Sequence, residues 1–171
     1  MDMTYSAKSI ASSLIRLSTE HGLWISNLKL QRILYFSWLE YFRRTGNRLF
    51  YDEFQAWGDG PVVPSVYYEY WANAANTLFV PHRSPEKVDA ETEMFLLEML
   101  AKYKDHTSGD LVRLSIKTDP WMENYYPRKK NTIPVEFMEY EALHPPFRIR
   151  VASYIDRIKS RGSTSCDPFD V

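Results

Sequence analysis

Apolar side chains recur at helical spacing near the start of the chain. Four of them fall at i, i+3, i+7 and i+10, one face of a helix with a 3.6-residue period: Ala7, Ile10, Leu14 and Leu17. This spacing predicts a helix that begins near Ser6 and ends at His21 and Gly22, where the glycine supplies a stop signal.

A second apolar stripe follows after a short gap. Its members are Leu30, Leu34, Trp38 and Tyr41 or Phe42. Ser26 or Asn27 can cap the first turn, because a side-chain oxygen there accepts a hydrogen bond from a backbone N–H that the helix leaves unpaired. Gly46 suits the left-handed conformation that commonly follows the last turn. We therefore expect a second helix between these caps.

The helical spacing is lost between Asn47 and Val63. Apolar and polar residues are interspersed there, and a run that reads Gly58-Asp59-Gly60-Pro61 then interrupts them. A phosphate-binding loop needs four residues between its glycines and a Lys-Ser/Thr pair, and Pro61 lacks an N–H donor, so this run is not such a loop. The segment instead predicts a short strand and a rigid turn, in which glycine permits positive φ.

Helical spacing returns after this turn. Pro64 fits the first position of a helix, and the apolar residues that continue it are Val66, Tyr67, Tyr70, Trp71 and Ala74. A longer helix is expected from about Asp89 to Tyr103, and its inward residues are predicted to be Met94, Leu97 and Ala101. Shorter helices are predicted at residues 110–117, 120–126, 134–143 and 148–159.

These patterns predict a mainly α fold, a single compact helical domain with a small β hairpin or short sheet near residues 49–63. The domain is expected to span residues 1–159. Residues 160–171 are rich in Ser, Asp, Gly and Pro and are predicted to form a flexible C-terminal tail.

Composition and charge narrow the class of protein. The 171 residues carry a formal charge of −1 and 15% aromatic residues, which excludes a disordered chain and gives no general attraction to nucleic acid. Cys166 is the single cysteine, which favours a reducing compartment. The N-terminus lacks a signal-peptide pattern and no 18-residue apolar run occurs, so we expect a cytoplasmic protein without membrane insertion.

The sequence contains no catalytic or metal-binding constellation that we can identify. The four histidines are too far apart for a ligand motif, no nucleophile elbow occurs, and Cys166 lies in a polar tail. We therefore expect no enzyme activity, no metal and no cofactor.

Two basic features of the sequence leave open the hypothesis that the protein binds DNA. Arg128, Lys129 and Lys130 are adjacent, and they form either a functional patch or a solvated surface. The first two predicted helices also resemble a helix-turn-helix motif, with Lys29 and Arg32 at the start of the second helix. The aromatic character of the later turns favours burial of that helix over insertion into a groove.

Several motifs resemble one family. The first runs from Leu28 to Phe36 and reads LKLQRILYF; the second runs from Phe54 to Pro64 and reads FQAWGDGPVVP; Asp119-Pro120-Trp121 follows later. These segments resemble the Panacea domain, also described as SocA-like or GepA-like, over roughly residues 5–160. The positions that match the family motif are Leu28, Lys29, Leu30, Gln31, Tyr35, Trp57, Gly58, Gly60, Pro61, Val62, Tyr67, Pro120 and Trp121.

This chain departs from the family at one point. The family often has a Thr-His pair four residues before its Asp-Pro-Trp, whereas this chain has Ser115 and Ile116. A role that needs an imidazole there is in doubt, while a packing role would survive.

The resemblance implies an antitoxin of a bacterial or prophage toxin-antitoxin system, which neutralises a co-encoded protein toxin by direct binding. One branch of the family delivers its toxin to a protease. The alternative hypotheses for this chain are a helical DNA-binding regulator and a small enzyme. The partner-binding candidates are polar or aromatic residues that core packing does not explain, together with Trp57 beside its turn: Gln55, Trp57, Asp59, Tyr68, Asn73, Trp121, Tyr125 and Tyr126. The alternative for Leu30, Leu34, Tyr35 and Trp57 is that they are core.

Overall fold

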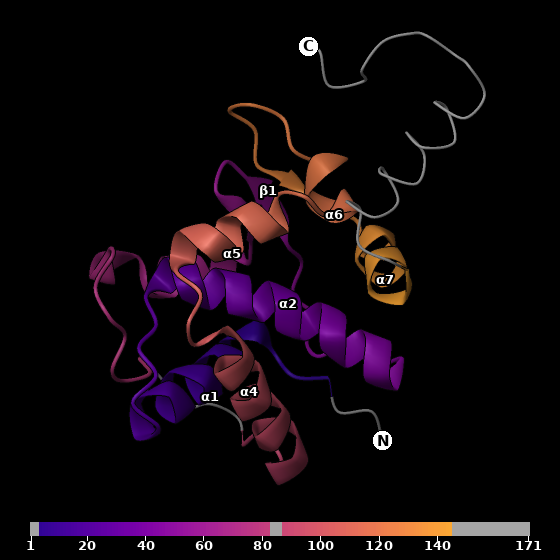
Figure 1. The fold of residues 1–171 in the computed structure, drawn as a ribbon. Helices are drawn as coiled ribbons and strands as arrows, with labels where there is room; N and C mark the ends of the chain where they lie inside the picture. Colours follow the sequence, from indigo (N-terminus) through magenta and orange to yellow (C-terminus); the bar gives the residue numbers. More distant parts are fainter. Residues whose placement is uncertain (1–3, 83–86, 145–171) are drawn as a thin grey trace, which may run out of the picture.

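The computed structural model describes residues 4–82 and 87–144. The predicted helix at 148–159 and the predicted tail from residue 160 lie outside the described residues. Within them the chain is mainly α with a small antiparallel sheet, as predicted (Figure 1).

The first two helices begin where their caps predict. Helix α1 (Ala7–Glu20) is capped by Ser6, whose hydroxyl accepts a hydrogen bond from the Ser9 N–H. Helix α2 (Asn27–Thr45) is capped by Ser26 and is followed by Gly46 at φ 71°, the left-handed conformation expected of it.

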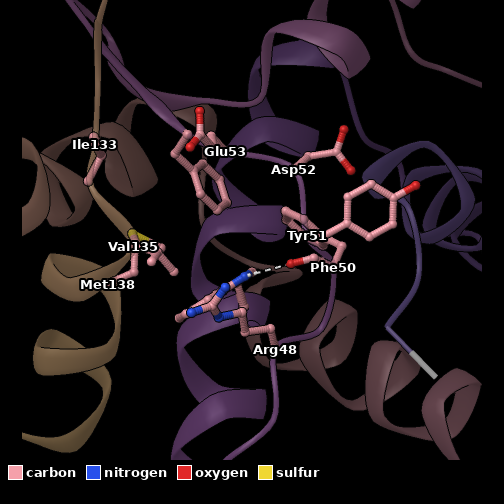
Figure 2. A pocket seen from close by; sticks show the side chains of 10 residues that line it. Arg48, Phe50, Tyr51, Asp52, Glu53, Ile133, Val135 and Met138 are labelled. Atoms are coloured by element: carbon pink, nitrogen blue, oxygen red, sulfur yellow. Dashed lines mark hydrogen bonds between the residues drawn. The ribbon is translucent and has the colours of Figure 1, made fainter. Parts of the chain in front are cut away.

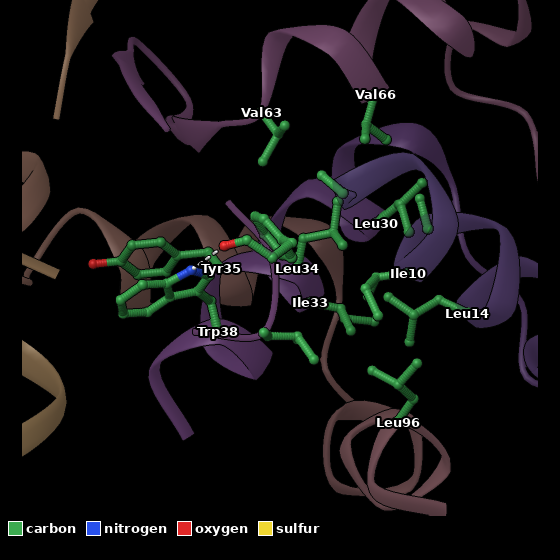
Figure 3. Close-up of a cluster of buried hydrophobic side chains, with 14 of the residues drawn as sticks. Ile10, Leu14, Leu30, Ile33, Leu34, Tyr35, Trp38, Val63, Val66 and Leu96 are labelled. Carbon is green, nitrogen blue, oxygen red and sulfur yellow. Dashed lines mark hydrogen bonds between the residues drawn. The ribbon is translucent and has the colours of Figure 1, made fainter. Parts of the chain in front are cut away.

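Helix α2 is the centre of the fold. It contacts α1 and α4 (Ala90–Tyr103) on one side, and β2 (Gly60–Val62) and α5 (Ser108–Ser115) on another (Figure 1). Its apolar side chains join one continuous buried cluster, in which Figure 3 shows Ile10, Leu14, Ile33 and Leu96 close together. The fold therefore depends on α2, whose side chains are mostly buried from Asn27 to Trp38.

The sheet is built from short strands. Strand β1 (Gln55–Trp57) lies between β2 and β3 (Asn131–Thr132), and both pairings are antiparallel. Trp57 pairs with Gly60 across the hairpin turn, and Gln55 pairs with Thr132. The hairpin falls within the predicted segment, whereas the third strand comes from a distant part of the sequence.

The predicted helix from Pro64 is shorter than its apolar spacing indicates. Helix α3 (Pro64–Glu69) ends before Tyr70, and a single 3₁₀ turn, η1 (Trp71–Asn73), follows it. The prediction that the helix continues through Trp71 and Ala74 is wrong, because Ala74 has φ 49° and Trp71 is exposed.

Helix α4 has its predicted bounds but not its predicted inward face. Met94 and Ala101 are exposed and Leu97 is only half-buried. The buried residues are Thr92, Leu96, Met99, Leu100 and Tyr103. Two apolar stripes run along this helix at helical spacing, and the stripe with the larger side chains faces the core.

Three further helices complete the described chain: α5, α6 (Asp119–Met122) and α7 (Val135–Leu143). Helix α5 begins with a capping box, in which Thr107 and Asp110 each accept a hydrogen bond from the other's backbone N–H. Helices α5 and α7 lie within about two residues of their predicted bounds, and α6 is one turn long.

Candidate functional site

Trp57 stands at the end of strand β1, beside the hairpin turn. Its indole Nε1 donates a hydrogen bond of 2.9 Å to Oε1 of Gln55, two residues back along the same strand. Side chains at i and i+2 of a strand point to the same face of the sheet. The strand therefore presents an indole and an amide together, with the ring only partly covered.

Two tyrosines of α3 surround the Trp57 ring. Tyr67 meets it edge to face at 4.8 Å between ring centroids, and Tyr68 lies at 6.0 Å. Lys130 places its ammonium 4.1 Å from the Trp57 centroid and donates a 3.0 Å hydrogen bond to the Tyr68 hydroxyl. A cation over an indole is the most favourable cation–π geometry among the aromatic side chains.

A second aromatic pair is attached to Trp57 through its backbone. Trp121 Nε1 donates a 2.7 Å hydrogen bond to the Trp57 carbonyl, and the Trp121 ring stacks on Tyr125 at 4.4 Å. Tyr126 follows and carries Lys129 over its ring at 5.0 Å. We call this set the Trp57 face; it comprises Trp57, Tyr67, Tyr68, Trp121, Tyr125, Tyr126, Lys129 and Lys130.

The rings of the Trp57 face differ in exposure. Tyr68 is 56% exposed and Tyr126 is 60% exposed, so both offer most of their surface to solvent. Trp121 and Tyr125 are half-buried and pack against the core. The two exposed tyrosines and Lys130 are therefore the part of the face that a partner can contact without unfolding the domain.

The structure brings most of the predicted partner-binding residues together. Besides the rings, Gln55 bonds Trp57, and Asp59 is exposed at the tip of the turn beside it. Asn73 lies apart in η1, where its backbone takes part in local turns with Tyr70 and Asn76. No hydrogen bond within the described ranges joins Asn73 to the residues of the face.

Sequence reasoning missed the position of Lys130. The adjacent basic residues at 128–130 could be either a functional patch or a solvated surface. The sequence near Gln55 gave no sign that residues 131–132 pair with that strand. That pairing, Ala56 with Asn131, brings Lys130 to the Trp57 ring. The apolar spacing placed Tyr67 on the helix that begins at Pro64, but only the family motif identified it as a candidate functional residue.

Two polar motif residues of α2 are buried by the fold. Gln31 accepts a 3.0 Å hydrogen bond from the Val63 N–H and donates one of 3.1 Å to Asn27. Lys29 donates a 3.3 Å hydrogen bond to the Lys104 carbonyl, and its burial lowers its pKa. Each of these two side chains satisfies a polar group inside the fold, so neither tip projects into solvent.

Arg32, one residue beyond Gln31, is completely buried. Its guanidinium lies against Gly60, and a Cβ built on that glycine would overlap Nη1. With Lys29 and Arg32 both buried, neither is available to a DNA backbone, and α2 is buried as the aromatic character of its later turns indicated.

The glycine and proline positions of the turn have different roles. Gly60 has φ 110° and is buried, whereas Gly58 is exposed and a Cβ there would contact nothing within 4 Å. Pro61 and Val62 are buried in β2. Of the two glycines, Gly60 alone adopts positive φ.

Tyr35 ties α2 to the start of α6. Its hydroxyl is 2.6 Å from Thr118 Oγ1, and burial raises the Tyr35 pKa. Thr118 Oγ1 in turn donates to the Ser115 carbonyl at 2.6 Å. Ser115, at the departure from the family pattern, is buried and donates to the Val112 carbonyl at 2.9 Å, which is a packing role. Leu30, Leu34 and Tyr35 lie in the buried core, as the alternative interpretation of these residues predicted.

A separate recess of about 80 Å³ lies between the loop at residues 48–54 and α7 (Figure 2). Two of the three charged side chains that line it, Arg48 and Asp52, have partners, and the third, Glu53, is exposed. Arg48 pairs with Glu139 at 2.8 Å, and Asp52 accepts hydrogen bonds from the Ala7 N–H and the Ser65 hydroxyl. This recess therefore joins elements of the fold and leaves the Trp57 face as the candidate functional site.

The described residues contain no group of three or more His, Cys, Asp or Glu side chains arranged to hold a metal ion. Nor does any helix in residues 4–82 and 87–144 combine the length and apolarity that a membrane span requires.

Comparison with known protein families gives a match. The family model described as "Antitoxin SocA-like, Panacea domain" matches residues 30–122, more than half of the chain. This range includes most of α2, the whole hairpin and all of α6. No curated protein and no solved structure matches the chain.

Proposed function

Because the chain belongs to the SocA-like antitoxin family with the Panacea domain, we propose that it is the antitoxin of a toxin-antitoxin pair and neutralises a co-encoded protein toxin by direct binding. The family name supports the antitoxin role in general. The Trp57 face supports direct binding as the mechanism, and it is the single observation that carries the proposal.

The face has the composition of a binding surface. Tyrosine, tryptophan and arginine supply a large part of the energy of protein interfaces, and a rigid ring loses little entropy on binding. Tyr68 is fixed by Lys130 on one side and by Tyr67 at 5.4 Å on the other. The ring is therefore exposed and held in place before a partner arrives.

The charges beside these rings indicate the chemistry of the partner. Arg128, Lys129 and Lys130 are exposed and adjacent, and two of them lie over tyrosine or tryptophan rings. A toxin surface with carboxylates around an apolar centre complements this arrangement, since opposite charges at a rim steer association.

Growth rescue and co-purification test the proposal. The product of the adjacent gene is expressed from an inducible promoter with and without this chain, and the two are then purified through a tag on the chain. We expect rescued growth and a stoichiometric complex. Rescue with a fall in the amount of toxin in the cell would indicate delivery to a protease. Failure of every neighbouring gene product to bind or be rescued contradicts the proposal.

A further inference from the structure

Arg32 is the most unusual buried group in the described part of the chain. It lies in the second turn of α2, and its side chain is fully buried beneath strand β2. A Cβ built on Gly60 would overlap its Nη1 and would lie 2.6 Å from Ser115 Oγ. The guanidinium therefore lies between the hairpin turn and α5.

None of the three guanidinium nitrogens, Nε, Nη1 and Nη2, has a hydrogen-bond partner among the described residues. The neighbouring polar residues of the same helix differ in this respect. Lys29 donates to the Lys104 carbonyl, and Gln31 is bonded at both its amide oxygen and its nitrogen. An unpaired buried guanidinium is unfavourable to the folded state, because its desolvation is not offset by hydrogen bonds.

The charged and titratable groups that act on Arg32 are few. Asp59, which is exposed at the tip of the turn, and Tyr35, which is buried on α2, both favour the charged form. Burial acts in the opposite direction and lowers the Arg32 pKa to about 10. The side chain is therefore still a cation at neutral pH.

We propose that Arg32 is a carboxylate-binding residue, whose guanidinium receives a carboxylate that enters between the hairpin turn and α5. A carboxylate matches the guanidinium because two parallel N–H···O bonds join them in one plane. Two of the unpartnered nitrogens thereby gain acceptors, and the charge is neutralised.

Arg32 is fully buried, so a carboxylate reaches it only when the hairpin turn moves aside. Gly58 and Asp59 at the tip of that turn are exposed, and no atom lies within 4 Å of a Cβ built on Gly58. The turn also borders the Trp57 face through the pairing of Trp57 with Gly60. A carboxylate reaches Arg32 either as a small free anion or as an acidic side chain of a protein bound at that face. The inference goes beyond the proposed function, because it concerns a ligand class that the chain binds with or without a toxin.

The Nε–H resonance of Arg32 reports directly on such a ligand. In ¹⁵N-labelled protein it is assigned by its loss in Arg32→Lys. Titration with sodium acetate, against sodium chloride at equal ionic strength, measures the free anion. The complex with the adjacent gene product measures the acidic side chain. We expect a saturable shift of this resonance in at least one arm. A shift with acetate identifies a free carboxylate, and a shift in the complex alone identifies a partner side chain.

Stability measurements supply a second readout. Arg32→Met removes the unpaired charge at similar volume, so the melting temperature of the free protein should rise. The matched variant Lys29→Met removes a cation that has a partner, and its melting temperature should not rise. The proposal is overturned if the Arg32 resonance is unmoved in the acetate arm and in the complex, or if Arg32→Met lowers the melting temperature. Failure of growth rescue would leave the acetate arm intact, so the two proposals fail separately.

Discussion

The two sides of α2 are built from different chemistry. The side toward α1 and α4 is aliphatic, with Ile10, Leu14, Ile33 and Leu96 fully buried against one another (Figure 3). The side toward the hairpin and α5 buries Gln31, Arg32 and the Tyr35 hydroxyl.

This difference separates the part of the molecule that stabilises the fold from the part that we propose binds. Aliphatic burial is the main source of folding free energy and needs no specific partner. Buried polar groups, in contrast, are favourable only when each is paired, and one of those on the hairpin side is not. The Trp57 face lies on this second side.

The largest effect is expected in the aliphatic half. Leu14→Ala should lower the free energy of unfolding by about 2–5 kcal/mol, because it leaves a cavity where the side chain is fully buried. Leu114→Ala is the matched control on exposed surface and should change it by less than about 0.5 kcal/mol. Urea titrations of both variants measure the difference. Equal effects would show that the core is not centred on α1 and α2.

Substitution of one glycine of the hairpin turn should lower the stability of the protein, whereas substitution of the other should not. Gly60→Ala should cost about 1–3 kcal/mol, since φ 110° is strained for any residue with a Cβ and Arg32 already fills the space. Gly58→Ala should change stability by less than about 1 kcal/mol, because no atom lies within 4 Å of its Cβ. Thermal unfolding compares them, and a Gly60→Ala protein as stable as Gly58→Ala would contradict the turn geometry.

The ion pairs at the C-terminal end of α2 belong to neither side of the helix described above, and they should contribute little to the free energy of unfolding. Hydrogen bonds from Arg43 and then Arg44 lower the Glu40 pKa to about 2, from an ordinary value of 4.5. The stabilisation is therefore present above pH 4.5 and is lost as the pH falls toward 2. We expect Glu40→Gln to lower stability by about 1 kcal/mol or less at neutral pH, and the difference from wild type to vanish near pH 2. A difference that is constant with pH would exclude the carboxylate as its source.

Local signals predicted the helices but not what the helices bury. Ser6, Ser26 and Gly46 fix their ends by hydrogen bonding and backbone geometry within a few residues, so the sequence shows them directly. Two apolar stripes compete on α4, and only the packing against α1 decides between them.

The candidate site was only partly predictable for the same reason. Aromatic residues near the glycine turn marked Trp57 and Tyr68, but Lys130 joins them through the pairing of β1 with β3, and no local pattern encodes that pairing. Burial of Arg32 went unpredicted because a charged residue within an amphipathic helix is ordinarily exposed. The flexible tail expected at residues 160–171 lies outside the described residues and stays a prediction.

The affinity of two exposed-tyrosine variants for the product of the adjacent gene tests the central claim most directly. Tyr68, on the Trp57 face, is 56% exposed, and Tyr51, at the recess in Figure 2, is 65% exposed. Neither substitution by Ala should change the melting temperature appreciably. By isothermal titration calorimetry we expect Tyr68→Ala to weaken binding about tenfold or more and Tyr51→Ala to weaken it less than about twofold. Equal affinities for the two variants, or a loss confined to Tyr51→Ala, would contradict the claim that the Trp57 face binds the toxin.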